Sequence, residues 1–358
     1  MPFASPPLAR PLLSRLGVRL PIIQAPMAGV SSPRMAAAVG GAGALGSIGL
    51  GAVDAEGARA MIAAVRERWD GPLNVNLFCH QPAKAQPQVE AAWIERLRPE
   101  FAALDAAPPA ALSEIYCSFV EDEAMLTMLL QTRPSVVSFH FGLPGATALA
   151  ALREAGLVLL ASATSLAEAR VLAEAGVDAI VAQGWEAGGH RGMFDPNAPD
   201  DQLGTLALTR MLVREFDLPI IASGGIMDGA GAAAALMLGA AAVQLGTAFV
   251  ATDESLADSG YRHALTSPAA EHTMMTRVVS GRPARCLANR FTALDAPADA
   301  IPAYPIAYDL GKALHAAGKA RGEYGFGAQW AGQGAPLARA MPAAELVATL
   351  AAELERAW

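Results

Sequence analysis

The stretch Val177-Asp-Ala-Ile-Val-Ala-Gln-Gly-Trp-Glu-Ala-Gly-Gly-His190 joins a short apolar run to a glycine-rich loop that ends in a histidine. Residues 177–182 have the composition of a buried parallel strand, and polar Gln183 ends the run. The three glycines that follow allow sharp turns and let a ligand lie against main-chain N–H groups. His190 suits proton chemistry because the ordinary pKa of imidazole lies near neutrality. A plain turn followed by a surface histidine gives the same local pattern.

The segments on either side of this stretch alternate between predicted strands and predicted helices. The strands lie near residues 21, 44, 73, 136, 158, 179, 219 and 241, and helical sequence follows each of them except the last. This alternation is typical of a parallel sheet, and eight units predict an α/β fold closed as a (β/α)8 TIM barrel. An open doubly wound sheet is the competing topology. Gly40-Gly-Ala-Gly-Ala-Leu-Gly46 contains G-x-G-x-x-G, but it follows a helix and opens a strand, the reverse of the dinucleotide fingerprint.

Two domains are predicted from this rhythm. The barrel is expected over residues 1–252, with 78–133 partly outside it, and a C-terminal segment, 335–358, completes it with a helix over 343–355. Residues 253–334 break the rhythm and are expected to form a smaller domain that covers one end of the barrel. A helix is predicted over 87–104, whereas the assignment of 108–133 stays open.

Composition excludes several classes of protein. The chain has 358 residues, a net charge of −8 and no run of Lys or Arg, so we expect no nucleic-acid partner. Its three cysteines are scattered, which fits a reducing cytoplasm. Residues 1–19 lack the apolar core of a signal peptide. The uncharged stretch 229–252 is long enough to span a bilayer, but it divides into a helix over 230–238 and a strand over 241–245, so no membrane span is expected.

Polar side chains gather where the predicted strands end. In a (β/α)8 barrel these carboxyl ends form the catalytic face. They carry Gln24, Asn76, His80, His140, Gln183, His190 and Gln244. Amides dominate and carboxylates are nearly absent, and buried amides need hydrogen-bond partners such as the carbonyl and N–H groups of a flavin ring. Each residue taken singly could instead cap a neighbouring loop.

The loops after the seventh and eighth strands are the usual phosphate site of this fold. Ser223-Gly-Gly225 precedes a helix whose N-terminus offers free N–H groups to an anion, and Gly246-Thr247 adds a second glycine and a hydroxyl. Together they predict a monophosphate site, although ordinary turn chemistry would look the same. His80, His140 and His190 could bind zinc instead, but no H-x-H pair exists and second-shell carboxylates are few, so no metal is expected.

With these motifs in view, the chain resembles the nitronate monooxygenase family, formerly 2-nitropropane dioxygenase, and its class I bacterial members in particular. The resemblance covers nearly the whole sequence. It rests on Gln24-Ala-Pro-Met27, Asn74-Val-Asn-Leu77, Gln183-Gly-x-Glu-Ala-Gly-Gly-His190, Ser223-Gly-Gly-Ile-Met-Asp228, Gln244-Leu-Gly-Thr247 and Gln329-Trp-Ala-Gly-Gln-Gly334.

The resemblance implies an FMN-containing barrel with a smaller substrate domain and His190 as the catalytic residue. The positions expected to bind FMN are Ala25, Pro26, Met27, Asn76, Gln183, Gly188, Gly189, Ser223, Gly224, Gly225, Gln244, Leu245, Gly246 and Thr247. The positions expected to line the substrate site are Tyr116, His140, Tyr304, Tyr308 and Lys312. The last three are four residues apart, which places them on one face if the segment is helical.

The implied reaction is the oxidation of an anionic alkyl nitronate, above all propionate 3-nitronate, by O₂. We expect the nitronate to give an electron to the flavin and then to react onward with O₂, releasing a carbonyl compound and nitrite. His190 would position the anion, or act as a base if neutral nitroalkanes are also used. An FMN-dependent enoyl-acyl-carrier-protein reductase and an NAD(P)H:quinone reductase share most of these motifs, and a non-catalytic flavin-binding protein is the third possibility. The sequence does not give the oligomeric state.

Overall fold

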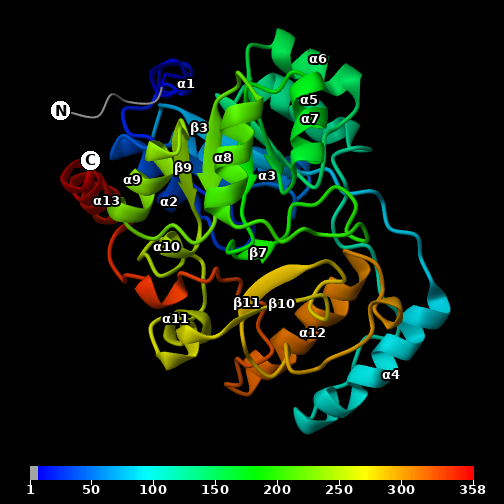
Figure 1. Ribbon diagram of the computed structural model, residues 1–358. Helices are drawn as coiled ribbons and strands as arrows, with labels where there is room; N and C mark the ends of the chain where they lie inside the picture. Colours follow the sequence, from blue (N-terminus) through cyan, green and yellow to red (C-terminus); the bar gives the residue numbers. More distant parts are fainter. Residues whose placement is uncertain (1–6) are drawn as a thin grey trace.

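The fold is built on eight parallel strands, seen in a computed structural model that describes residues 7–358 (Figure 1). Their order around the sheet is β1-β9-β8-β6-β5-β4-β3-β2, and every neighbouring pair is parallel. In chain order the strands are β1 (Ile22–Gln24), β2 (Gly46–Gly49), β3 (Leu73–Phe78), β4 (Val136–His140), β5 (Val158–Ala163), β6 (Ala179–Gln183), β8 (Ile220–Ser223) and β9 (Ala242–Leu245).

The two ends of this sheet meet at β1 and β2. Ile23 pairs with Leu45, the residue just before β2. Leu45 N–H donates to the Ile22 carbonyl, and Gln24 N–H donates to the Leu45 carbonyl, both at 3.0 Å. The sheet therefore closes on itself, which confirms the predicted (β/α)8 barrel.

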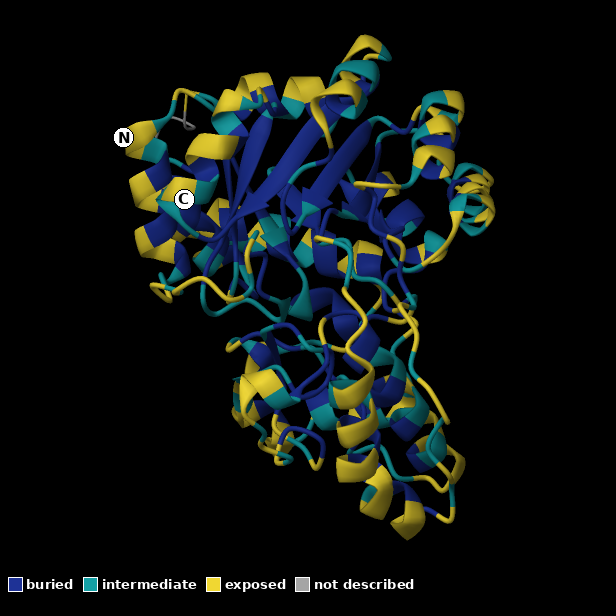
Figure 2. Cartoon of the chain, turned by 90° about the vertical axis from the view of Figure 1, so that its right-hand side faces the viewer, coloured by how far each residue is buried: buried dark blue, intermediate teal, exposed yellow. Residues whose placement is uncertain are grey.

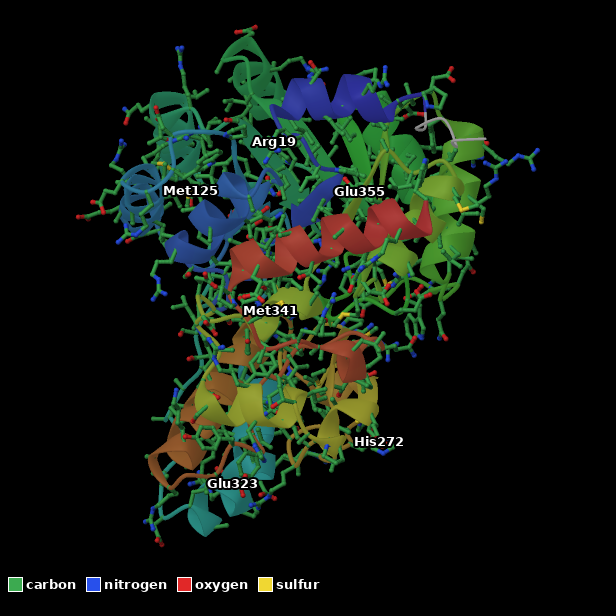
Figure 3. The ribbon with its side chains drawn as sticks, turned by 90° about the vertical axis from the view of Figure 1, so that its left-hand side faces the viewer. Arg19, Met125, His272, Glu323, Met341 and Glu355 are labelled. Atoms are coloured by element: carbon green, nitrogen blue, oxygen red, sulfur yellow. The ribbon has the colours of Figure 1, made fainter. Side chains whose placement is uncertain are left out.

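Helices cover the outside of the barrel. They are α2 (Pro33–Gly41), α3 (Ala55–Arg66), α5 (Glu123–Thr132), α6 (Ala146–Glu154), α7 (Leu166–Glu174), α8 (Thr205–Glu215), α9 (Gly229–Met237) and α13 (Ala343–Ala357). Several begin at a side chain that accepts a hydrogen bond from the first turn, such as Ser32, Asp54 and Ser165. The last helix, α13, packs against α9 and α2 and so occupies the eighth helical position of the barrel (Figure 3).

The N-terminal helix α1 (Ala9–Leu16) is an element that the sequence did not predict. Its apolar side chains Leu12 and Leu16 belong to the same buried cluster as Val158, Leu160 and other residues of the barrel strands. In Figure 1 this helix lies at the end of the barrel opposite β7. The carboxyl ends of the strands are therefore the end that stays available for a site.

A second lobe lies beyond those carboxyl ends (Figure 2). A three-stranded sheet with the order β10-β11-β7 connects it to the barrel. Its regular elements are α4 (Pro87–Ala103), β7 (Gly189–His190), α10 (Thr247–Val250), α11 (Ser259–Leu265), β10 (Thr273–Thr276), β11 (Ala284–Leu287), α12 (Ile306–Ala320) and the 3₁₀ helices η1 (Pro268–Glu271), η2 (Ala298–Ala300) and η3 (Ala335–Leu337).

Helix α4 lies outside the barrel, within the segment 78–133 that is expected to lie partly outside it. It lies between β3 and β4 in the chain, but its side chains Trp93 and Phe101 are buried with Leu310 and Phe326 of the second lobe. The helix that covers the barrel between β3 and β4 is α5, which lies in the segment that sequence patterns left unassigned. Trp93 and Phe101 find an apolar partner only in the second lobe, so α4 leaves the barrel.

The remaining expectations concern the chain ends, the membrane and the cysteines. The predicted helix and strand within 229–252 appear as α9 and β9. None of the helices in residues 7–358 has the length and apolar composition needed to cross a bilayer. Cys79, Cys117 and Cys286 are free thiols. Residues 1–19 were predicted not to form a signal peptide, and residues 1–6 of this segment lie outside the described part of the chain.

Candidate active site

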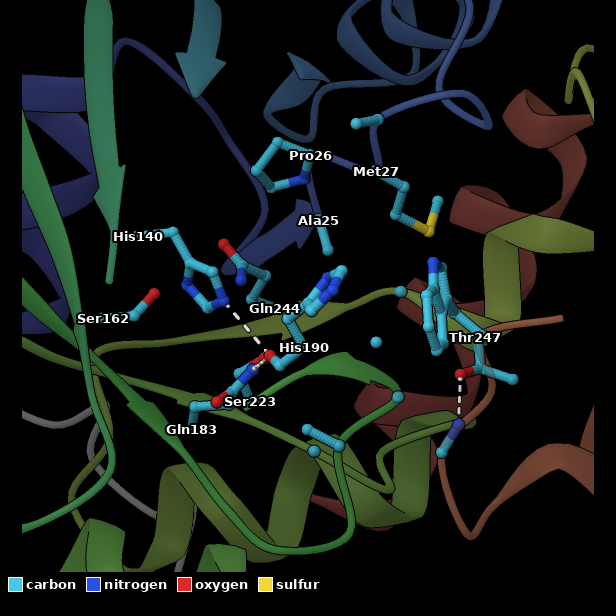
Figure 4. Close-up of a pocket in the computed structure, with 18 of the residues that line it drawn as sticks. Ala25, Pro26, Met27, His140, Ser162, Gln183, His190, Ser223, Gln244 and Thr247 are labelled. Carbon is cyan, nitrogen blue, oxygen red and sulfur yellow. Dashed lines mark hydrogen bonds between the residues drawn. The ribbon is translucent and has the colours of Figure 1, made fainter. Parts of the chain in front are cut away.

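A cavity opens where the barrel meets the second lobe, at the carboxyl ends of the strands (Figure 4). Its walls come from the loop after β1, from the ends of β3, β4, β6, β8 and β9, from the glycine loop after β6, and from Tyr304, Tyr308 and Trp330 of the second lobe. The lining contains amides, hydroxyls, imidazoles and aromatic rings, and no Asp, Glu, Lys or Arg side chain is among the described residues that form it.

The loop that carries His190 is held by Gln183. The Gln183 amide nitrogen donates to the His190 carbonyl at 3.0 Å, and its oxygen accepts from Gly192 N–H at 2.7 Å. His140 Nε2 lies 3.1 Å from the same His190 carbonyl, so that nitrogen carries the hydrogen. On the other side, His190 pairs with Ala284 as part of β7 and β11. The backbone position of His190 is thus fixed by both lobes.

The His190 side chain lies among aromatic rings. The ring centroids of Phe141, Tyr304 and Trp330 lie 5.7, 5.1 and 5.0 Å from its own. Its Nε2 lies 2.9 Å from Ser280 Oγ, and that hydroxyl lies 3.3 Å from the Arg282 carbonyl. When Ser280 donates to this carbonyl, it accepts from His190 Nε2–H, and His190 Nδ1 is left as the proton acceptor.

The imidazoles of the site are neutral at physiological pH. Burial lowers the pKa of His190 well below its ordinary value, and the charges of His140, Arg282 and His80 act in the same direction. Burial likewise lowers the pKa of His140 to about 4; its hydrogen bond to the His190 carbonyl opposes this shift, and Arg282 adds to it. A neutral His190 can accept a proton or donate a hydrogen bond.

The far end of the cavity is built from glycines and hydroxyls. Gly224 and Gly225 have φ values of +127° and +71°, a backbone conformation that favours glycine. Thr247 Oγ1 accepts from Gly332 N–H at 3.0 Å, which ties the end of β9 to the segment that returns from the second lobe. Ser223 also faces this end, and its hydroxyl makes no hydrogen bond within the described residues.

One detail of the predicted anion site is wrong. Asp228 accepts from Gly231 N–H at 2.8 Å, and Glu353 of α13 accepts from Gly229 N–H at 2.9 Å. Two N–H groups at the start of α9 therefore already have carboxylate partners and are not open to another anion. The polar groups that remain at this end of the cavity belong to the loops after β8 and β9.

Most of the residues selected from the sequence line this one cavity. The lining includes Ala25, Pro26, Met27, Asn76, Tyr116, His140, Gln183, Gly188, Gly189, His190, Ser223, Gly224, Gly225, Gln244, Gly246, Thr247, Tyr304 and Tyr308. Leu245 does not line it, because its side chain points to the opposite side of the strand and is buried against the outer helices. Leu245 takes part only through its carbonyl, which accepts from Ala25 N–H at 2.8 Å.

Two polar strand ends are also directed away from the cavity. Gln24 is fully buried. Its amide nitrogen donates to Ser31 Oγ at 2.8 Å, and its amide oxygen accepts from Ser47 N–H at 2.9 Å. His80 is buried beside Tyr304, with a distance of 5.0 Å between ring centroids. Gln244, in contrast, faces the cavity, and its amide has no partner among the described residues.

The Tyr304, Tyr308 and Lys312 set is only partly helical. Helix α12 begins at Ile306, so Tyr304 precedes it, and only Tyr308 and Lys312 share a helix face. Lys312 does not line the cavity; its ammonium lies 4.9 Å from the ring centroid of Tyr116 and 5.7 Å from that of Tyr308. Burial lowers the pKa of Lys312. Lys312 therefore stands behind two phenol rings rather than in the cavity itself.

Sequence reasoning missed three residues beside His190. Trp330 lies within a motif that was recognised, but no role was given to its ring. Ser280 and Phe141 carried no motif at all, and only their contacts with His190 reveal them. Glu186, the one carboxylate of the glycine loop, accepts from Thr205 N–H and Oγ1, each at 2.8 Å, and so caps α8 instead of facing the cavity.

The sequence profile of the nitronate monooxygenase family matches residues 10–353. This chain belongs to that family. It is 61% identical to a nitronate monooxygenase of Paraburkholderia phytofirmans over 97% of this chain and 95% of the relative, and 54% identical to one of Pseudomonas aeruginosa over 95% and 97%. The solved structure of nitroalkane oxidase from Streptomyces ansochromogenes superposes with a TM-score of 0.88 at 41% identity, covering 97% of this chain and 98% of the other.

Membership of the nitronate monooxygenase family makes the chain an oxidoreductase and supports the oxidation of nitronates in general. The arrangement of the side chains bears on the alternative of a metal site. Within residues 7–358 no group of three or more His, Cys, Asp or Glu side chains is arranged to hold a metal ion. His80, His140 and His190 contact Phe141 and Tyr304 and not a common centre.

Proposed function

We propose that the protein uses FMN to oxidise alkyl nitronates, propionate 3-nitronate above all, with O₂, and releases a carbonyl compound and nitrite. The observation that carries the proposal is the neutral imidazole of His190 at the wall of a cavity that has no charged side chain. Such a site can orient a small anion through hydrogen bonds without a carboxylate to repel it.

The polar groups left without a protein partner are those that a flavin would use. Gln244 and Ser223 face the cavity with their polar atoms unpaired, and Asn76 uses only its nitrogen, on Ser138 at 3.0 Å. We infer that these residues hold the ring and that the loops after β8 and β9 hold the phosphate through backbone N–H groups and Thr247. Bound there, FMN would supply the electron acceptor.

The substrate is placed by residues of both lobes. The Tyr304 hydroxyl is buried and has no hydrogen-bond partner, although a buried hydroxyl normally has one. Its ring centroid lies 5.1 Å from that of His190, so both groups face the same part of the cavity. We infer that the nitronate oxygens accept hydrogen bonds there. Tyr308 and Trp330 close the apolar side around the carbon chain and exclude water.

His190 can orient the anion when Ser280 donates to its Nε2, because Nδ1 then carries the hydrogen that the anion accepts. When Ser280 instead accepts from Nε2–H, Nδ1 is free to act as a base. A nitronate is already deprotonated, so its oxidation needs no base. With a neutral nitroalkane, His190 Nδ1 would accept the proton from the carbon next to the nitro group. The ring can do this because it is neutral at physiological pH and because Ser280 engages Nε2.

Oxygen uptake tests the proposal. Purified protein should contain FMN, and adding propionate 3-nitronate should start O₂ consumption with nitrite release and without a nicotinamide cofactor. Rapid oxidation of NADH or NADPH with a quinone or an enoyl thioester, and no response to nitronate, would support a reductase on the same barrel instead. FMN without either activity would indicate a flavin-binding protein.

A further inference from the structure

The cavity binds an anion in the proposed function, yet none of its described lining residues is charged. Neutral hydrogen-bond donors alone favour an anionic ligand only modestly over a neutral ligand of the same shape. A nearby charge in a medium of low polarity discriminates more strongly. A buried cation, Arg282, contacts the aromatic cluster around His190.

Arg282 is a buried cation without a carboxylate partner. Its exposed fraction is 2%, and none of the ion pairs in the described part of the chain includes it. Its guanidinium donates to the carbonyls of Met193 and Phe194, while Nε has no partner. Burial lowers its pKa to about 10, so the group stays charged at neutral pH. Glu168 and Asp195 act on this charge electrostatically, but neither forms an ion pair with it, so part of its field reaches the surrounding side chains.

Phe141 connects this charge to the site. The Arg282 Cζ lies 4.0 Å from the centroid of the Phe141 ring, within the range of a cation–π contact. The same ring lies 4.4 Å from His140, 5.7 Å from His190 and 5.6 Å from Tyr304, centroid to centroid. The cation is thus one ring away from the groups that face the ligand.

The backbone of Phe141 supports a specific role for this contact. Its φ is +72°, in the left-handed region that bulky residues rarely adopt. Such a conformation is strained and persists where the surrounding structure imposes it, often at functional sites. Here it directs the ring of a strand-end residue toward both Arg282 and His190.

The effect of Arg282 already appears in its neighbours. Its charge contributes to lowering the pKa of His80, His140 and His190, three imidazoles that lie around the Phe141 ring. A field that disfavours a second cation at these positions favours an anion at the same place. Lys312 also carries charge near the site, but it is exposed behind Tyr116 and Tyr308 and is screened by solvent.

We propose that Arg282, held against Phe141, is the residue that makes the cavity select anionic over neutral ligands, and that it does so without touching them. The inference rests on the proposed function and identifies a residue that would give the site a preference for nitronates over nitroalkanes. Arg282 is in this sense a positioning and electrostatic residue rather than a catalytic one.

The test compares one anion with one neutral molecule of the same shape. Propanoate and propanamide are titrated into FMN-loaded protein by calorimetry, for wild type, Arg282→Met and Arg282→Lys. Arg277→Met is the matched control, because Arg277 also donates to the loop that follows His190, at the Pro196 carbonyl and at Asn197 Oδ1 (3.4 Å), but has no contact with Phe141. This control distinguishes the loss of hydrogen bonds to the loop after His190 from the loss of the charge beside the Phe141 ring.

We expect Arg282→Met to weaken propanoate binding by about tenfold, as expected for removal of one unit charge near a partly buried site. Propanamide binding should stay within about twofold. Arg277→Met should leave the propanoate-to-propanamide ratio at its wild-type value. An unchanged ratio in Arg282→Met overturns the inference.

The lysine variant provides a second measurement if Arg282→Met does not fold. A buried lysine has a lowered pKa, so Arg282→Lys should bind propanoate nearly as well as wild type at pH 7 and lose this affinity by pH 9. The groups that face this position are His80, His140, His190, Tyr304, Arg277, Glu168 and Asp195. The wild type has the same neighbours, so equal pH profiles in wild type and Arg282→Lys would contradict the inference.

The two proposals fail in different ways. Protein that lacks FMN, or that consumes no O₂ with propionate 3-nitronate, contradicts the proposed function, and titrations of the protein as purified still rank the variants. Protein that does both, but whose Arg282→Met variant keeps the wild-type preference for propanoate, contradicts only the role of Arg282.

Discussion

The side chain of Gln183 holds the backbone of His190: the amide nitrogen lies 3.0 Å from the His190 carbonyl. The amide oxygen of the same side chain accepts from Gly192 N–H at 2.7 Å, so one residue at the end of β6 fixes the loop on both sides of the histidine. His140 adds a second donor to the carbonyl at 3.1 Å. The position of His190 therefore depends on two strand ends and not on its own loop.

Replacing Gln183 by Met should keep the side-chain volume and lose both hydrogen bonds. We expect a loss of about 1–3 kcal/mol in the free energy of unfolding, because Gly192 N–H is left unpaired, and a fall in kcat of at least about tenfold. Denaturant unfolding and oxygen uptake measure the two effects. Gln131→Met, at an exposed glutamine of α5, is the control, and equal kcat values in both variants would contradict the role of Gln183.

The His190→Asn variant removes the imidazole from the proposed active site. FMN content should stay at the wild-type level, since His190 is expected to face the substrate, while turnover of propionate 3-nitronate falls by about 10²-fold, because the anion loses the group that orients it. Flavin absorbance and oxygen uptake with propionate 3-nitronate report the two quantities. Wild-type turnover in this variant would refute the assignment.

Ser280 is predicted to select the tautomer of His190. The Ser280→Ala variant loses the contact at 2.9 Å and should lower kcat by about tenfold while KM changes little, because the ring stays in its aromatic surroundings. The loss should be larger for neutral nitroalkanes, whose oxidation requires a base. Ser255→Ala, at another buried serine, controls for the loss of a hydroxyl. Equal losses in the two variants would show that Ser280 has no specific role.

His80 should make the fold sensitive to acid. Burial lowers its pKa to about 4 in the folded state, and the charge of Arg282 adds to this shift. Unfolded protein therefore binds more protons as the pH falls below about 6.5, and stability is lost from there down through the folded pKa. We expect His80→Phe to remove about 2 kcal/mol of the loss of stability between pH 8 and pH 5. Unfolding curves at both pH values measure it, and identical pH dependence in wild type and variant would contradict the prediction.

Gly188 lets the returning segment of the second lobe lie against the His190 loop. A Cβ at this position would lie 2.5 Å from Gly332 N and 2.6 Å from Ala331 C, both backbone atoms that cannot rotate away. The Gly188→Ala variant should therefore retain less FMN after gel filtration, since Gly332 also anchors Thr247. Gly41→Ala has open space around the new methyl group and is the control. Full FMN retention by both variants would show that this contact is not required.

The local features of the chain predicted the barrel correctly. Apolar runs such as residues 179–182, followed at a fixed distance by helical sequence, specify strands and helices through near-neighbour contacts alone. The order of the eight units then leaves few topologies, and closure follows. Helix α4 was predicted as a helix in a segment expected to lie partly outside the barrel, but its packing partners Leu310 and Phe326 were not predicted, because they lie far away in the chain.

The sequence likewise predicted only some features of the candidate site. Motifs around Gln183, Ser223 and Gln244 could be recognised because glycines and amides follow strand ends at short range. Gln24 and Gln244 both end a strand and look equivalent in sequence. The amide of Gln24 is hydrogen-bonded to Ser31 and Ser47, whereas Gln244 faces the cavity. Which way a strand-end side chain points depends on register and on the neighbouring strand, which no local pattern contains.

The sequence by itself determined a barrel of alternating strands and helices and the loop that presents His190, since both depend on residues that are close along the chain. Only the tertiary structure decided what surrounds that histidine. Ser280, Arg282 and Trp330 lie 90 or more residues away in the chain, and they reach it because β11 pairs with β7 and the second lobe closes over the strand ends. Contacts of this kind depend on packing between distant segments, and a single sequence carries no local signal for them.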